Sequence, residues 1–155
     1  MPLAVGQKAP SFDIIASNGK RLRLEDYLGK QNVVLFFYPG DFTPICTKEA
    51  CGFRDLYEEL SSKDTEVIGV SLDDDASHAR FVKEHRLPFP LVADGEKVLT
   101  TAYAAAGRLR SLLGKTNRIT YVIDKKGTIA GVFDSELRAG KHLDGVKDLI
   151  AKLPA

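Results

Sequence analysis

The chain has 155 residues, of which 44% are hydrophobic and 28% are charged, and its formal net charge is +1. This composition is ordinary for a globular protein, so it excludes a disordered chain and offers no basic field to nucleic acid. The longest apolar run, residues 33–38, is too short to cross a bilayer, and two cysteines are too few for the disulfide framework of a small secreted protein. We expect one domain over residues 1–155.

The first predicted elements are a hairpin and a buried strand. Asn18-Gly19 is a turn signal between two short strands, which we expect at 12–15 and 21–24. The run NVVLFFY at 32–38 is apolar without alternation, which is typical of a strand buried on both faces. Pro39-Gly40 ends this strand.

Eight further elements follow from the periodicity of the sequence. They are a helix over about 47–62, a strand at 66–72, a helix at 75–85, an extended piece at 89–93, a helix at 96–106, two strands at 119–124 and 128–134 joined by Lys126-Gly127, and a closing helix at 144–153. This order implies an α/β protein with a mixed central sheet and helices on both faces, compatible with a thioredoxin-like fold. The segment 107–117 follows no readable pattern.

The most informative stretch is PGDFTPICTKEACGFR, residues 39–54, where a buried strand ends and Cys46 opens a helix. Active sites of open α/β sheets gather beyond the carboxyl ends of the strands. The unpaired N–H groups at a helix N-terminus favour an anion, and the thiolate is the reactive form of cysteine. The sequence therefore predicts that Cys46 is a nucleophile, largely ionised near neutral pH.

Helical phase separates the two cysteines. Cys46 lies above an apolar stripe formed by Ala50, Phe53, Tyr57 and Leu60, whereas Cys51 projects from a flank about 140° around the helix. In an intact helix their Cα atoms lie roughly 8–9 Å apart, and a disulfide usually requires less than about 7 Å. The two can form a disulfide only if the first helical turns unwind, which the poor helix former Gly52 favours.

The motif Pro39-x-x-x-Thr43-x-x-Cys46 resembles the peroxidatic motif of peroxiredoxins, and FFYPGDFTPICTKEACGFRD resembles the peroxiredoxin Q, or bacterioferritin-comigratory-protein, subfamily. Matches at 77–94 and 118–127 extend the resemblance over almost the whole chain. It implies a thioredoxin-like fold and a thiol-dependent peroxidase that reduces hydrogen peroxide and organic hydroperoxides. It also implies recycling by thioredoxin or a similar dithiol protein.

The resemblance assigns roles to five residues of this sequence. It implies that Cys46 is the peroxidatic nucleophile and Cys51 the resolving thiol, joined after attack in an intramolecular disulfide. Thr43 resembles the family threonine whose hydroxyl binds the thiolate and the peroxide, and Pro39 the proline that shields the site. Arg118 resembles the arginine that faces the thiolate.

The roles of other residues in and near the motif can each be interpreted in two ways. Glu49 is either a surface carboxylate or a substrate-site group that orients an arginine such as Arg118. Arg54 either does likewise or pairs with a surface acid. Ile45 stands where the subfamily often has Gly, which narrows the pocket mouth or alters peroxide preference.

The histidines and the acidic run are interpreted as structural. His78 and His85 are too far apart along a helix for a usual metal pair, and His142 is expected in a loop. The run Asp73-Asp74-Asp75 is interpreted as a helix-capping loop. No phosphate-binding loop or dinucleotide fingerprint appears, so we expect neither a cofactor nor a metal.

Three alternative functions remain open from the residues alone. They are a thioredoxin-type disulfide reductase, a redox-switched sensor or holdase, and a non-catalytic binding module. The reductase chemistry normally uses Cys-x-x-Cys, whereas four residues separate the cysteines here. No secretory signal is visible, so we expect a cytoplasmic protein without a membrane or nucleic-acid partner, with a mature plastid form as the alternative. The resemblance implies a monomer, since an intramolecular disulfide needs no partner subunit.

Overall fold

The computed structural model describes residues 2–105, 117–134 and 139–153, and its centre is a five-stranded sheet. Its strands are β3 (Asn32–Phe37), β4 (Thr65–Ser71), β5 (Leu91–Ala93), β6 (Ile119–Ile123) and β7 (Ile129–Asp134). They lie in the order β5-β4-β3-β6-β7. β3, β4 and β5 run parallel, whereas β6 is antiparallel to both of its neighbours, which confirms the predicted mixed sheet.

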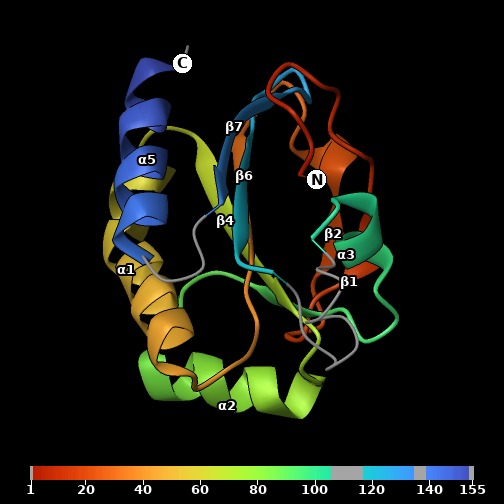
Figure 1. Ribbon diagram of the computed structural model, residues 1–155, viewed down its shortest axis with the longest axis vertical. Helices are drawn as coiled ribbons and strands as arrows, with labels where there is room; N and C mark the ends of the chain where they lie inside the picture. Colours follow the sequence, from red (N-terminus) through yellow and green to blue (C-terminus); the bar gives the residue numbers. More distant parts are fainter. Residues whose placement is uncertain (1, 106–116, 135–138, 154–155) are drawn as a thin grey trace.

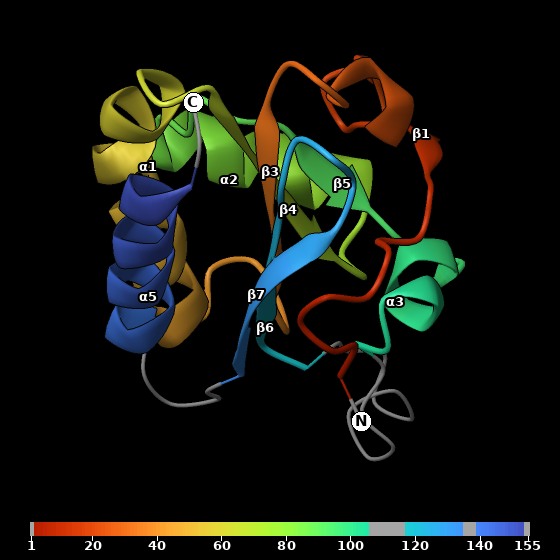
Figure 2. The ribbon, with the colours of Figure 1, turned by 90° about the horizontal axis from the view of Figure 1, so that it is seen from above.

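Helices cover both faces of this sheet. They are α1 (Pro44–Ser61), α2 (Asp75–His85), α3 (Val98–Ala102) and α5 (Ala139–Lys152). α1 and α5 lie side by side on one face, while α3 and the N-terminal hairpin of β1 (Asp13–Ile15) and β2 (Arg21–Arg23) lie on the other (Figures 1 and 2). Phe81 of α2 joins the buried cluster beneath α1 and α5. The predicted hairpin and two-sided helical cover are therefore confirmed.

Strand β3 lies in the middle of the sheet, and every one of its residues is buried. Successive side chains of a strand point to opposite faces. Leu35 and Phe37 therefore enter the cluster under the hairpin, whereas Val34 and Phe36 enter the cluster under α1 and α5. Two covered faces explain why this stretch of sequence is apolar without alternation.

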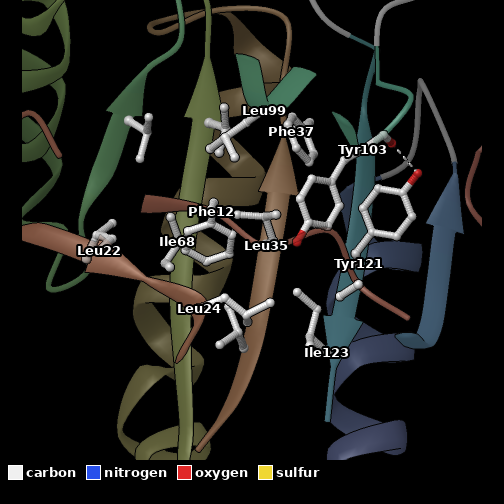
Figure 3. Close-up of a cluster of buried hydrophobic side chains, with 14 of the residues drawn as sticks. Phe12, Leu22, Leu24, Leu35, Phe37, Ile68, Leu99, Tyr103, Tyr121 and Ile123 are labelled. Carbon is white, nitrogen blue, oxygen red and sulfur yellow. Dashed lines mark hydrogen bonds between the residues drawn. The ribbon is translucent and has the colours of Figure 1, made fainter. Parts of the chain in front are cut away.

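The cluster under the hairpin ties the N-terminal segment to the sheet (Figure 3). Phe12, Leu22 and Leu24 pack against side chains of β3, β4, β6 and α3. Within it the hydroxyl of Tyr121 donates a hydrogen bond of 2.6 Å to the carbonyl of Tyr103. The hairpin is therefore part of the core of this face.

Several element boundaries differ from the predicted ones for local reasons. α1 begins at Pro44 and not near Thr47, because proline lacks an N–H and suits the first position of a helix. β5 begins at Leu91, since the prolines before it cannot donate to a sheet ladder.

The helix expected over 96–106 is shorter in the structure. α3 ends at Ala102, and Ala104 adopts a positive φ of 52°, which is incompatible with a continuing right-handed helix. Residues 106–116 lie outside the described residues, and so does nearly all of the segment 107–117 that follows no readable pattern.

Gly69 in the centre of β4 leaves no room for a side chain. A Cβ at this position would lie 2.6 Å from Cδ2 of Leu91 and 2.8 Å from Cζ of Phe36. We expect Gly69→Ala to lower the free energy of unfolding by about 1–3 kcal/mol through overpacking, as measured by urea denaturation. Gly95→Ala is the control, because nothing lies within 4 Å of its Cβ position. Equal stability of the two variants would contradict this packing.

Candidate active site

Cys46 lies in the first turn of α1, directly beyond the end of β3. Helix α1 begins at Pro44, and the residue before it, Thr43, is the extended N-cap with φ −78° and ψ 149°. The first turn of a helix carries backbone N–H groups without intrahelical partners. Cys46 belongs to this electropositive first turn, and its side chain is buried, at 1% exposure.

The guanidinium of Arg118, a residue distant in the sequence, contacts this sulfur. Arg118 immediately precedes β6, and Ile119 at the start of β6 pairs with Phe37 at the end of β3. The antiparallel pairing therefore places Arg118 beside the loop that leads into α1. Its Nη2 donates to Sγ of Cys46 at 3.1 Å, and the side chain is buried. Arg118 is therefore not a solvated surface residue.

Glu49 holds the other branch of the same guanidinium. Nη1 of Arg118 donates to Oε1 of Glu49 at 3.1 Å, and Glu49 is fully buried. Glu49 follows Cys46 by three residues, so both side chains leave α1 on the same side. Of the two readings of Glu49, the surface carboxylate is wrong and the arginine-orienting group agrees with the contacts.

His142 extends this set of contacts, and its predicted place in a loop is wrong. α5 begins at Ala139, five residues earlier than expected, and carries His142 in its first turn. Nδ1 of His142 lies 3.4 Å from Oε2 of Glu49 and 2.7 Å from Oγ1 of Thr120. The sequence contains a signal for this placement, because His142, Val146 and Ile150 share one helical face and all are buried.

Thr43 and Pro39 lie in the loop between β3 and α1. Pro39 is buried, and Thr43 is half-buried. The hydroxyl of Thr43 donates to the carbonyl of Gly40 at 2.9 Å. Because this bond uses the hydroxyl hydrogen, the lone pairs of Oγ1 are left to accept a hydrogen bond.

Cys51 lies on the same helix but apart from this cluster. Both cysteines are free thiols, with Cys46 buried and Cys51 half-exposed, and α1 is continuous across them. Gly52 packs against α5 so closely that a Cβ would lie 2.2 Å from Cδ1 of Leu143. The glycine therefore permits close helix packing, in addition to lowering the helix propensity beside Cys51.

Arg54, the other arginine considered at the sequence level, does not reach the cluster. Its Nε donates to Oδ1 of Asp55 at 3.0 Å, and its Nη1 donates to the carbonyl of His85 at 2.8 Å. The reading of Arg54 as the partner of a surface acid agrees with these contacts. In the described ranges, no group of three or more His, Cys, Asp or Glu side chains is arranged to hold a metal ion.

The comparisons with known proteins agree with this geometry. Residues 5–132 match the model of the AhpC/TSA family. The chain belongs to this family. It is 42% identical over 149 residues to "Peroxiredoxin Q, chloroplastic" of Populus jackii, covering 96% of this chain and 68% of the relative. It is 41% identical over 157 residues to "Peroxiredoxin Bcp" of Bacillus subtilis, covering 99% of this chain and 96% of the relative.

A solved structure shows the same fold for a related protein. The crystal structure of Peroxidoxin BcpB from Mycobacterium tuberculosis matches with a TM-score of 0.87 and 32% identity, and the match covers 97% of this chain and 98% of the other. The predicted thioredoxin-like fold and the peroxiredoxin Q resemblance are confirmed. The protein is a peroxiredoxin, that is, a thiol-dependent peroxidase.

The guanidinium of this peroxiredoxin contacts a sulfur and a carboxylate at once. A cation at hydrogen-bond distance favours the thiolate form of Cys46 over the thiol. The buried carboxylate of Glu49 binds the same cation and, as a like charge near the sulfur, opposes the thiolate. We therefore expect Glu49 to orient Arg118 while it reduces the electrostatic stabilisation that the sulfur receives.

Substitution of Glu49 separates these two effects. Glu49→Gln keeps the side-chain shape but removes the negative charge, so we expect a larger thiolate fraction of Cys46 on the acidic side of neutral pH. The measurement is the ultraviolet absorbance of the thiolate during a pH titration, in a Cys51→Ser background. Glu58→Gln, at an exposed position of the same helix, is the control. An unchanged or smaller thiolate fraction in Glu49→Gln would show that the carboxylate does not act on the sulfur.

None of the helices in the part of the chain that the structure describes has the length and apolarity needed to span a membrane.

Proposed function

We propose that Cys46 is the peroxidatic residue and Cys51 the resolving residue of this peroxidase. The observation that carries the proposal is the 3.1 Å contact from Nη2 of Arg118 to Sγ of Cys46, at the N-terminus of α1. A buried cysteine of an ordinary core is a small hydrophobe that needs no cation. The cation and the helix end together favour the anionic, reactive form of the sulfur.

In the first step the thiolate of Cys46 attacks one oxygen of a hydroperoxide, and the O–O bond breaks. The sulfur becomes a sulfenic acid, and the leaving oxygen takes a proton and departs as water or an alcohol. The guanidinium of Arg118 stabilises the negative charge that moves onto the leaving oxygen. Thr43 accepts the hydrogen bond of the hydroperoxide O–H, because its own hydrogen is donated to Gly40. Pro39 shields the reacting sulfur in its recess.

In the second step the thiolate of Cys51 attacks the sulfenic sulfur of Cys46, the S–S bond forms as the S–O bond breaks, and the hydroxide that leaves takes a proton and becomes water. An intact α1 would hold the two Cα atoms roughly 8–9 Å apart, beyond the usual reach of a disulfide. The turns from Cys46 to Cys51 must therefore unwind. Glu49 lies inside this segment, so unwinding also withdraws its carboxylate from Arg118. A thioredoxin-like protein then reduces the disulfide by thiol–disulfide exchange.

The rim of the site supports a mixed peroxide specificity. Ile45 is half-buried, and Phe42 is 43% exposed with its ring centroid 5.1 Å from that of Phe81. These apolar side chains offer contact to the carbon group of an organic hydroperoxide, whereas hydrogen peroxide requires only the polar centre. We therefore propose that the enzyme reduces both classes.

The positions and the redox chemistry of the two cysteines support a monomer that works in a compartment where thiols are kept reduced. Both cysteines lie on one helix, so a monomer suffices for the disulfide and no partner subunit need supply a thiol. Turnover requires that the two thiols be regenerated, which is usual in the cytoplasm and in the plastid stroma. We propose a monomer that works in such a compartment.

The roles of the cysteines are tested by serine variants in stopped-flow peroxide reduction. We expect Cys46→Ser to abolish peroxide consumption and Cys51→Ser to react once and stall as sulfenic acid, because the resolving thiol is missing. Peroxide turnover that survives in Cys46→Ser would refute the peroxidatic role. Efficient insulin reduction with slow peroxide consumption would instead indicate the disulfide reductase. Normal turnover of Cys51→Ser with thioredoxin would exclude Cys51 as the resolving residue.

The conformational change is tested by amide hydrogen exchange in the two redox states. We expect the amides of the first turns of α1, up to about Gly52, to be protected in the dithiol form and to lose protection in the disulfide form. Helix α2 is the internal control, since it contains no cysteine. Equal protection of α1 in both states would show that the disulfide forms without unwinding.

A further inference from the structure

A buried carboxylate lies in the loop that leads to Cys46. The side chain of Asp41 is 1% exposed, and it accepts three hydrogen bonds of 2.7 Å. The donors are the hydroxyl of Tyr38 on Oδ1, and the hydroxyl of Ser77 and Nδ1 of His78 on Oδ2. Burial alone would raise the pKa of Asp41, but the hydrogen bonds from His78, Ser77 and Tyr38 hold it below its usual value. Asp41 is therefore ionised at neutral pH.

The geometry around His78 indicates that its ring carries a positive charge. Nδ1 faces the carboxylate of Asp41, and Nε2 lies 3.0 Å from the carbonyl oxygen of Val92. Neither of these oxygens can donate. The hydroxyls of Tyr38 and Ser71 also lie 3.4 Å from Nδ1 and Nε2, but they donate to Asp41 and Asp73 at 2.7 and 2.8 Å. Each ring nitrogen is therefore placed to donate, which only the imidazolium can do at both nitrogens. A neutral ring would direct a lone pair at an oxygen inside the core. The ring is fully buried, so Asp41 and His78 form an ion pair without solvent contact.

The backbone of Asp41 is held as well as its side chain. Its N–H donates to Oδ2 of Asp73 at 2.8 Å, and the same oxygen accepts from the hydroxyl of Ser71. This N–H belongs to the same peptide plane as the carbonyl of Gly40, which accepts the hydroxyl of Thr43. Because the peptide is planar, fixing one edge fixes the other. The anchor of Asp41 therefore sets the direction of Oγ1 of Thr43.

The next residue shows that the loop is held in a costly conformation. Phe42 has φ 62°, a left-handed conformation that is unfavourable for a bulky side chain. Such a conformation persists only where its surroundings determine it, and the adjacent anchor at Asp41 does so. The loop before α1 thus has a fixed part that ends at Asp41 and a strained residue directly after it.

We propose that Asp41 and His78 are positioning residues, whose buried ion pair holds the loop ahead of Cys46 and stops the redox-driven unwinding of α1 at Phe42. The proposal rests on the proposed function of Cys46 and Cys51. The pair acts through the peptide between Gly40 and Asp41, which orients Thr43, and does not itself touch the peroxide. Phe42 is the hinge between the anchored strand end and the part of the helix that unwinds.

The charge of His78 is measured directly in the unmodified protein. Nitrogen NMR of the imidazole is expected to show both ring nitrogens of His78 protonated at neutral pH. A neutral ring would overturn the ion pair. This measurement needs no variant and does not depend on peroxide turnover, so its failure is distinguishable from the failure of the peroxidase assignment.

The positioning role is measured with Asp41→Asn and His78→Gln. We expect each to lower the rate constant for reaction with hydrogen peroxide roughly tenfold, as for a small misplacement of reacting groups. The rate of disulfide closure should not fall, since that step requires the unwound helix. Asp13→Asn is the matched control, because Asp13 forms an exposed ion pair with Arg21 at 2.6 Å.

Hydrogen exchange locates the boundary of unwinding. In the disulfide form of the unmodified protein, the amide of Asp41 should stay protected while those of α1 exchange, and Asp41→Asn should lose this protection. The proposal is overturned if the unmodified protein already exposes the Asp41 amide on oxidation. It is also overturned if both variants only lower the melting temperature and leave the peroxide rate constant unchanged well below it, because the pair is then structural alone.

Discussion

The site depends on one buried guanidinium that is shared by a sulfur and a carboxylate. Arg118 contacts Cys46 and Glu49 at 3.1 Å each, and all three side chains are nearly inaccessible to solvent. A buried cation without an anionic partner is strongly destabilising, so Glu49 compensates the charge of Arg118, and we propose that the same cation prepares the sulfur for reaction. The planar fork of arginine suits this double role, whereas a lysine would offer only a point charge.

In the proposed mechanism the cluster lies on a helix that is intact when the peroxide reacts and unwound when the disulfide forms. In the intact state α1 is supported by α5, through His142 near Glu49 and through Leu143 against Gly52. On its other side the helix continues from a loop that α2 and the end of β4 hold in place. We propose that the anchored loop before α1 confines the conformational change to the first turns of the helix.

Local sequence patterns were sufficient to predict much of the fold and part of the site. The apolar run of β3, the turn at Asn18-Gly19 and the periodicity of α2 depend on neighbours in the sequence, and the structure has them where they were expected. The start of α5 was misplaced, because residues 139–143 carry no strong cap or stop signal. His142 was consequently assigned to a loop, although its spacing to Val146 and Ile150 indicates a buried helical face.

The sequence by itself determined that a thiol lies at the start of a helix after a buried strand, because this is a local feature. Only the tertiary structure decided which distant groups meet that thiol. The antiparallel pairing of β6 with β3 carries Arg118 to Cys46 across 72 positions of the chain, and the packing of α2 brings His78 to Asp41. Such contacts follow from strand register and helix packing, which no short pattern of residues encodes, since each depends on the whole set of elements that share the core.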